Sequence, residues 1–230
     1  MIKRSMELNH FIPPSAVVHD GCNNPLRPLY ELENGVLAAV ELAFETGFST
    51  GIQKLETIKK VLRDRRGILN PEEFLCVSLG GGELGDPLYP SVLSEICTQI
   101  GVAPASLCLF FPDDVCLKFG LRALDQFLCL KRFGFRLGLD IVSLQTLPVL
   151  FVERLPADVL RLDPLDSLAL DEDPQSQRDI LDFVEFSANL LMIPAARGVS
   201  NHTQLSKLKS MGIRIGQGPL FSGQTANSLS

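Results

Sequence analysis

Histidine is scarce in this 230-residue sequence, and two of its three histidines lie within the first 19 residues. The sequence therefore argues against a metal site or a catalytic triad that depends on histidine side chains. None of the six cysteines belongs to a CxxC pair, the spacing that is typical of zinc and thiol redox sites. We expect buried, reduced thiols instead, as in the reducing cytoplasm.

Long apolar segments are also missing. No apolar run reaches the roughly 18 residues that a membrane helix needs, and the basic start of the chain lacks the apolar core of a signal peptide. We expect a cytoplasmic protein that does not associate with a membrane. The formal net charge is −6 and the pI about 5.1, which argues against a nucleic-acid partner bound by charge alone.

Proline and glycine are scattered, so no linker or low-complexity segment divides the chain. Near-continuous apolar runs that alternate with amphipathic stretches indicate a parallel sheet covered by helices. We predict a single α/β domain of the (β/α) barrel type, with a doubly wound open sheet as the alternative. The runs that predict strands are residues 36–44, 74–80, 106–111, 135–142, 158–163, 190–196 and 213–218.

Amphipathic helices are predicted by apolar residues that recur at helical spacing. The first predicted helix has Ile52, Leu55, Ile58 and Leu62 on one stripe, with charged residues opposite. The glycine-rich run 79–85 has neither the spacing of a phosphate-binding loop nor the start of a helix after it. The predicted helices cover residues 50–67, 90–101, 117–134, 175–190 and 201–212.

Functional side chains of such a barrel lie at the carboxyl ends of its strands. One strand, "RLGLDIVSL" at 136–144, carries a single acid in an apolar run, which could belong to a site, to the remains of one, or to a loop. The candidate site residues at the strand ends are Glu41, Ser78, Phe110, Asp140, Arg161, Asp163, Arg197 and Gln217.

Five segments taken together resemble the EAL domain, the bacterial phosphodiesterase domain that linearises cyclic di-GMP. Val40-Glu41-Leu42 stands where that family has its Glu-Ala-Leu signature, and the last two segments match without gaps. The resemblance implies a (β/α)8-type, TIM-like barrel over residues 25–230, preceded by an extension at 1–24. The segments are 27–45, 104–114, 133–144, 155–163 and 196–222.

The resemblance also implies a site with two Mg²⁺ or Mn²⁺ ions, and most of its ligands are replaced in this chain. The positions that keep the family residue are Glu41, Asp140, Asp163 and Gln217. The replacements are Ser78 for an asparagine ligand, Phe110 for a glutamate ligand, Ile141 for the second aspartate of a pair, Arg161 for a lysine near the water nucleophile, Arg197 for the glutamate before Gly-Val, and Ser200 for the glutamate after it.

Two hard dications need several oxygen ligands, and most of their charge must be met by carboxylates. In this chain Phe110 and Ile141 are apolar and Arg197 is a cation at ligand positions. We therefore expect no metal or other cofactor. Without a metal, no group lowers the pKa of a water molecule enough for phosphodiester hydrolysis, so we expect no enzyme activity and interpret Asp140 as a relic of an active site.

The two arginines allow two interpretations. Arg161 and Arg197 could hold the phosphates of a cyclic dinucleotide, because guanidinium groups form bidentate phosphate contacts. They could instead neutralise the retained acids and close the pocket with internal ion pairs, which we favour. Glu45 supports this choice, since the family has a phosphate-binding arginine there.

Sequence alone thus predicts an inactive EAL-like domain that acts as a bacterial regulatory protein through an unidentified protein partner. A metal-independent cyclic di-GMP receptor is the alternative, and a residual phosphodiesterase is a further one. Function on such a fold depends on sites that can be lost or replaced while the packing is kept.

Overall fold

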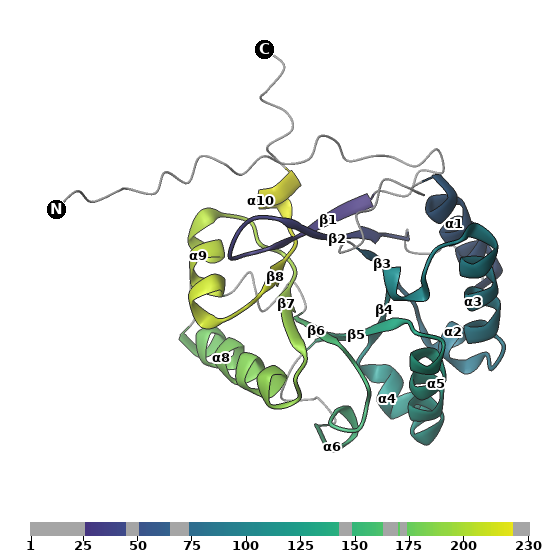
Figure 1. The fold of residues 1–230 in the computed structure, drawn as a ribbon. Helices are drawn as coiled ribbons and strands as arrows, with labels where there is room; N and C mark the ends of the chain where they lie inside the picture. Colours follow the sequence, from purple (N-terminus) through teal and green to yellow (C-terminus); the bar gives the residue numbers. More distant parts are fainter. Residues whose placement is uncertain are drawn as a thin grey trace, which may run out of the picture.

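Eight strands close into a barrel in the computed structural model, which describes residues 26–44, 51–64, 74–142, 149–162, 170 and 174–222. The strands follow one another around the barrel in chain order, as Figure 1 shows. They are β1 (Leu26–Glu31), β2 (Leu37–Leu42), β3 (Phe74–Ser78), β4 (Leu107–Pro112), β5 (Arg136–Ile141), β6 (Val159–Leu162), β7 (Ile193–Ala196) and β8 (Ile215–Gly216).

The first strand runs against the others. β1 is antiparallel to both β2 and β8, and every other neighbouring pair is parallel. Leu26, at the start of β1, pairs with Leu42, at the end of β2. The carboxyl ends of β2 to β8 therefore share one rim, and the chain enters the barrel at that rim. The predicted TIM-like barrel is confirmed.

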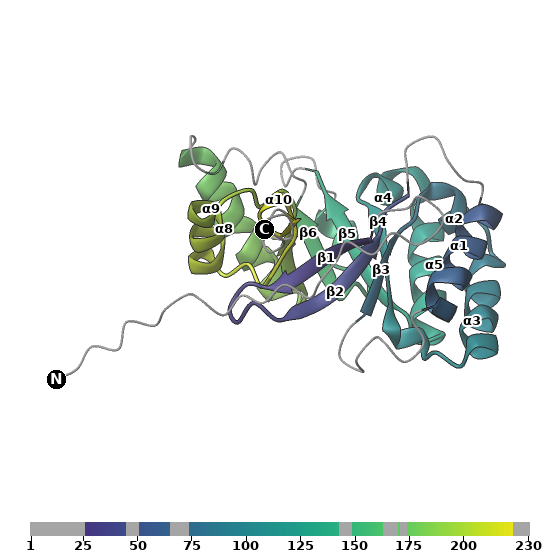
Figure 2. The ribbon, with the colours of Figure 1, turned by 90° about the horizontal axis from the view of Figure 1, so that it is seen from above.

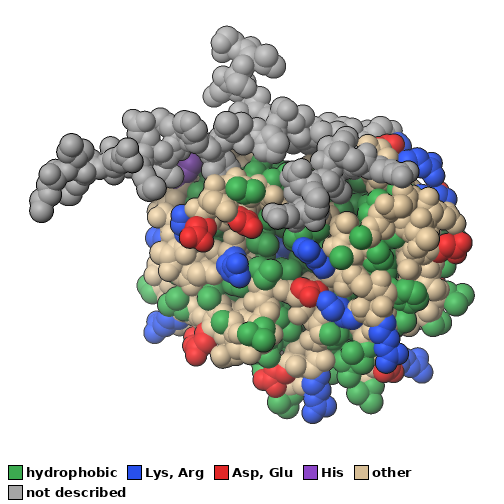
Figure 3. Space-filling view, in the orientation of Figure 1, with side chains coloured by type: hydrophobic (Ala, Val, Ile, Leu, Met, Phe, Trp, Pro, Cys, Tyr) green, Lys and Arg blue, Asp and Glu red, His purple; other side chains and the backbone are tan. Residues whose placement is uncertain are grey.

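Helices cover the outside of the barrel. Figures 1 and 2 show α1, α3 and α5 on one side and α8 and α9 on the opposite side. The surface in Figure 3 mixes hydrophobic, acidic and basic side chains, without one large area of a single charge on that face. The helices are α1 (Gly51–Asp64), α2 (Gly81–Gly85), α3 (Tyr89–Ile100), α4 (Asp114–Phe119), α5 (Leu121–Arg132), α6 (Val149–Val152), α8 (Pro174–Asn189), α9 (His202–Met211) and α10 (Pro219–Ser222), with a 3-10 turn, η1 (Pro104–Ser106).

Three of the helix ends are set by residues that can be recognised in the sequence. α9 begins after Asn201, whose side chain accepts a hydrogen bond from the backbone N–H of Gln204. α3 and α9 stop at Gly101 and Gly212, which take left-handed conformations with φ of 76° and 101°. Their predicted ends are confirmed.

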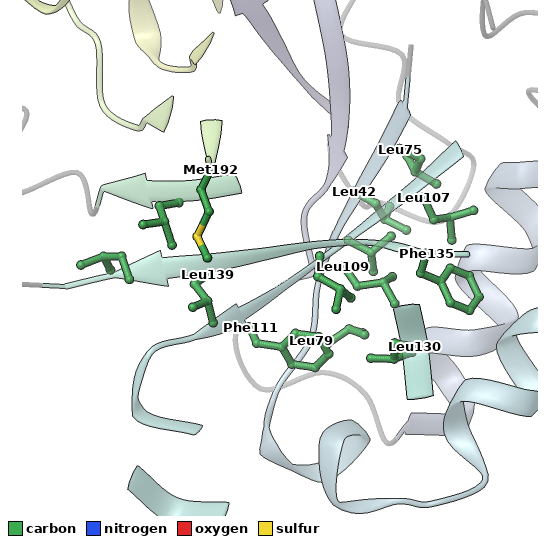
Figure 4. Close-up of a cluster of buried hydrophobic side chains, with 14 of the residues drawn as sticks. Leu42, Leu75, Leu79, Leu107, Leu109, Phe111, Leu130, Phe135, Leu139 and Met192 are labelled. Carbon is green, nitrogen blue, oxygen red and sulfur yellow. The ribbon is translucent and has the colours of Figure 1, made fainter. Parts of the chain in front are cut away.

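Side chains point alternately to the outside and to the inside of the barrel along a strand, which divides the buried core into two parts. Leu107, Leu109 and Phe111 of β4 face the helices and belong to the larger core, part of which Figure 4 shows with Phe135 and Leu130. Cys108 and Phe110 face the barrel interior. The interior core consists of Leu29, Ala38, Ala39, Phe74, Cys76, Cys108, Phe110, Val159, Ala195 and Ile215.

The structure corrects three predictions about helices. The predicted helix 117–134 is two elements, because Gly120, with φ of 51°, separates α4 from α5. The glycine-rich run 79–85 does start a helix, the short α2. Ile52 is exposed and does not join the buried stripe of α1, which Ile58, Val61 and Leu62 form instead.

The cysteines agree with the expected free thiols where the structure describes them. Cys76, Cys97 and Cys108 are buried and free, and Cys129 is half-buried and free. Cys76 and Cys108 are in register on β3 and β4, and burial raises the pKa of the Cys76 thiol well above its ordinary value. Among the described residues, no helix has both the length and the apolar character needed to cross a membrane.

Candidate functional site

The carboxyl rim of the barrel brings together seven of the eight candidate residues. Each comes from a different strand end or from the residue just after it, so that residues as distant as 41 and 217 meet. Asp163 lies outside the described residues, as do Glu45 and the extension at 1–24. The residues that the structure places at the rim are Glu41, Ser78, Phe110, Asp140, Arg161, Arg197 and Gln217.

Arg161 lies at the centre of this group, and its side chain is fully buried. Its Nε donates to Oδ1 of Asp140 at 2.6 Å and its Nη2 to Oδ2 at 3.0 Å, a bidentate ion pair. Asp140 and Arg161 are register partners on β5 and β6, so the strand pairing itself brings these two side chains together. Nη1 lies 3.0 Å from Oε1 of Glu41, so the two side chains form an ion pair. The geometry of this contact is not that of a hydrogen bond, and Nη1 has no hydrogen-bond partner among the described residues.

An aromatic ring fills the barrel beneath the guanidinium group. The Phe110 ring has Cζ of Arg161 at 3.9 Å from its centroid, a cation–π contact. The ring fits because its neighbour on β5 is Gly138, where an added Cβ would overlap the Phe110 side chain. Phe110 therefore fills the interior core and supports Arg161.

Glu41 is almost completely buried and is surrounded by donors. Gln217 Nε2 donates to Oε2 at 3.0 Å, and Ser78 Oγ donates to Oε1 at 3.1 Å. Arg197 Nη2 also donates to Oε1, in addition to the ion pair with Arg161. Four side chains thus hold this one carboxylate.

The charge states of the site follow from these contacts. Burial alone would raise the pKa of Glu41, but Arg161, Arg197 and the hydrogen bond from Gln217 outweigh burial and lower it to about 2. Burial alone would lower the pKa of the Arg161 guanidinium, yet Asp140 and Glu41 outweigh it and raise that pKa. At neutral pH Glu41 is therefore held as an anion and Arg161 as a cation.

Arg197 differs from Arg161 in its exposure and in how few contacts it makes. Its side chain is 26% exposed, against 0% for Arg161. Apart from the contact with Glu41, its Nη2 is 3.9 Å from Oδ2 of Asp140, beyond hydrogen-bond distance. Its Nε is buried and has no hydrogen-bond partner among the described residues.

The described residues do not fit a pair of divalent cations. The guanidinium of Arg161 occupies the space between Glu41 and Asp140, the two candidate acids in the described part of the rim. No group of three or more histidine, cysteine, aspartate or glutamate side chains in the described ranges could hold an ion. The described residues of the site keep fixed charges, and they offer the partly exposed Arg197 to the rim.

Two buried acids near the rim are not among the eight candidate site residues. Asp113 accepts a hydrogen bond from the backbone N–H of Val142 and so ties the end of β5 to the loop after β4. Glu83 of α2 pairs with Lys54 of α1 at 2.8 Å and accepts from Gly80 N–H. The only sequence signal for Asp113 was its place after a strand, and Glu83 had none, because its partner lies on another element.

Comparison with known proteins places this geometry in context. The EAL domain family model matches residues 38–224. No curated protein sequence matches the chain.

Solved structures share the fold at low sequence identity. The EAL domain of Mycobacterium smegmatis DcpA is 16% identical with a TM-score of 0.79, over 86% of this chain and 90% of that one. The phosphodiesterase PaMucR in complex with c-di-GMP is 19% identical with a TM-score of 0.73, over 85% and 88%. The cAMP-bound EAL enzyme Bd1971 is 17% identical with a TM-score of 0.77, over 85% of this chain, which spans only 60% of Bd1971.

Proposed function

The chain belongs to the EAL domain family, and from that premise we propose that it is a catalytically inactive member. It acts as a bacterial regulatory protein by binding another protein, and it does not hydrolyse cyclic di-GMP. PaMucR, a phosphodiesterase with the same fold, has been solved with c-di-GMP, so the fold itself is compatible with hydrolysis. The difference is in the side chains at the rim.

One observation carries the proposal: the buried guanidinium of Arg161 pairs with both Glu41 and Asp140. A guanidinium stays protonated and cannot leave this pocket as a metal ion can, because it is part of the chain. Entry of a dication would place two like charges beside each other in a buried space. The carboxylates that would ligate a metal are thus neutralised from within.

Hydrolysis of a phosphodiester also needs a nucleophile. A bound dication can lower the pKa of a water molecule to about 7. The guanidinium groups of Arg161 and Arg197 can stabilise an anion, but they cannot coordinate a water oxygen and lower its pKa in this way. Neither histidine nor cysteine lies among the rim residues. This set of side chains therefore supports binding and not bond cleavage.

A protein partner is supported by apolar side chains on the outside of the barrel. Leu117 of α4 and Leu121 of α5 are both about 70% exposed, on either side of Gly120. Contiguous exposed apolar surface marks protein-binding sites, and we assign these two leucines to such a surface. Net charge and the mixed surface in Figure 3 give no corresponding support for nucleic acid.

The proposal is tested by incubating the purified chain at high concentration with cyclic di-GMP in Mg²⁺, in Mn²⁺ and in EDTA. Linear dinucleotide is measured by chromatography, with an active EAL phosphodiesterase as the positive control. We expect no product above the protein-free rate in any buffer. Formation of linear dinucleotide that depends on the metal, by an activity that copurifies with the folded chain, would overturn the proposal.

A further inference from the structure

Two exposed faces of the molecule combine leucine side chains with charges of opposite sign. The first, which we call the α5 face, lies on α4 and α5, and the second, the α8 face, lies on α8 and the two residues after it. Figures 1 and 2 show α5 and α8 on opposite sides of the barrel. The α5 face consists of Leu117, Leu121, Arg122, Leu128 and Arg132, and the α8 face consists of Leu181, Asp182, Glu185, Ala188 and Leu191.

The exposed charges of the α5 face are positive. Arg122 and Arg132 are exposed, and neither forms an ion pair with a described residue. They outnumber Asp125, the exposed acid of the same helix, while Lys118 of α4 is already paired with Asp114. In a chain whose formal net charge is −6, this face therefore carries a local excess of positive charge beside three exposed leucines.

The α8 face carries the complementary charges. Asp182 and Glu185 are exposed, and neither forms an ion pair with a described residue. They outnumber Arg178, the exposed cation of the same helix, and the exposed Leu181 lies beside them. Opposite potentials on two surfaces determine which surfaces meet and in which orientation. The α8 face therefore matches the α5 face both in the sign of its charge and in its exposed apolar side chains.

Leu191, at the end of the α8 face, has a backbone conformation that costs stability. Its φ is 58°, the one positive φ outside glycine among the described residues, and glycine is the usual residue in this conformation at the end of a helix. Its side chain is 93% exposed, so packing within one molecule does not offset the cost. Burial of the side chain against a second molecule would offset it, which supports an interface at this position.

We propose that the α8 face of one copy of this chain docks on the α5 face of another copy. Because the two faces lie on opposite sides of the barrel, one molecule cannot join them to each other, and each contact takes a different face from each copy. Such heterologous contacts continue into a ring or an open chain of copies. The net charge of −6 on every copy opposes association, so we expect it to be weak and to depend on concentration.

This inference goes beyond the proposed function, which concerns a different protein. A protein that the chain regulates through Leu117 and Leu121 would have to displace the second copy from the same leucines. Self-association would then control how much of that surface is free.

The test is sedimentation equilibrium of the full chain over a range of concentrations, with the charge of one face reversed at a time. One variant combines Arg122→Glu with Arg132→Glu, and the other combines Asp182→Lys with Glu185→Lys. We expect the average mass of the wild type to rise with concentration and each variant alone to stay monomeric, because its two faces then have the same sign. An equimolar mixture of the two variants should associate again, since every α5 face in it finds an α8 face of opposite sign.

The matched control combines Arg63→Glu with Arg154→Glu, two exposed arginines that belong to neither face. It changes the net charge as much as the α5-face variant does and should still associate. Leu191→Gly should weaken the association at least tenfold. It should also raise the melting temperature of the dilute, monomeric chain, because glycine adopts the left-handed conformation without strain.

A wild-type mass that does not change with concentration would overturn the inference and leave the exposed leucines to another protein. A monomeric mixture of the two variants would overturn it too, as would a control variant that dissociates as fully as they do. If the α8-face variant alone associated like the wild type, the contact would not use the α8 face and the inference would be wrong. Failure of the proposed function is separate, since it is detected as linear dinucleotide and not as a change in mass.

Discussion

A guanidinium and a metal ion satisfy carboxylates in different ways. Two divalent ions draw several carboxylates towards a centre, whereas Arg161 spreads one charge over three nitrogens that face Glu41, Asp140 and Ser78. The plane of the group also stacks on Phe110. Arg161 therefore replaces the electrostatic role of a metal and cannot replace its chemistry.

Replacing Arg161 by Gln should destabilise the protein. Two acids would remain in the rim with only Arg197 to oppose them, and breaking a buried ion pair by removing one partner typically costs about 3–5 kcal/mol. Urea unfolding would measure the loss. The control is Arg122→Gln, on the exposed surface of α5, which should change the free energy of unfolding by less than about 0.5 kcal/mol. An equally small change for Arg161→Gln would show that the ion pairs of Arg161 do not stabilise the fold.

The carboxylate of Glu41 should make the free energy of unfolding depend on pH in the acid range. Its folded pKa of about 2 lies below its ordinary value of 4.5, so its contribution is complete above pH 4.5 and is lost as the pH falls towards 2. Between pH 6 and pH 3 this one group should account for about 2 kcal/mol of lost stability. Unfolding of Glu41→Gln across the same range should show a shallower slope.

The control for this slope is Glu95→Gln, on the exposed side of α3. Its curve should run parallel to that of the wild type. If Glu41→Gln also ran parallel to the wild type, the carboxylate would not be held as an anion in the folded state.

At the scale of elements, the closeness of β4 and β5 determines how the site is supported. Gly138 has no side chain, and the Phe110 ring uses that space beneath Arg161. A glycine inside a strand is otherwise unfavourable, because it has no side chain to pack. Here the missing side chain is what allows the neighbouring strand β4 to place an aromatic ring inside the barrel.

Gly138→Ala should therefore destabilise the barrel by about 1–3 kcal/mol, as expected for overpacking. The added methyl group would displace the Phe110 ring and with it the support of Arg161. Thermal unfolding would measure the change. Gly82→Ala in α2, where an added Cβ meets no atom within 4 Å, is the matched control and should be close to neutral, while Phe110→Leu combined with Gly138→Ala should recover part of the loss.

The helices show where sequence reasoning succeeds and where it fails. Gly101 and Gly212 could be recognised as helix ends because each follows an amphipathic stripe. The break at Gly120 could not, since the apolar pattern continues from α4 into α5 across it. Ile52 fits the stripe by its spacing, but it lies in the first turn of α1, and its side chain is exposed.

For the whole molecule, the order of apolar strands and amphipathic helices favoured a (β/α) barrel and left an open sheet as the alternative, and the resemblance to the EAL domain favoured the closed barrel. The candidate residues could also be found, because the carboxyl ends of parallel strands meet at one rim. Their pairing could not be derived. That Asp140 lies beside Arg161 depends on strand register, and that Gln217 reaches Glu41 depends on closure of the barrel, neither of which is local in sequence.

The reversed first strand has a practical consequence. Arg27 is exposed and pairs with Glu41 in the antiparallel ladder, so its backbone lies one strand spacing, about 5 Å, from the buried acid. A fluorophore attached at position 27 would thus stand at the edge of the rim without replacing any residue of the network. It offers an optical reading of changes at the rim, in solution and in real time.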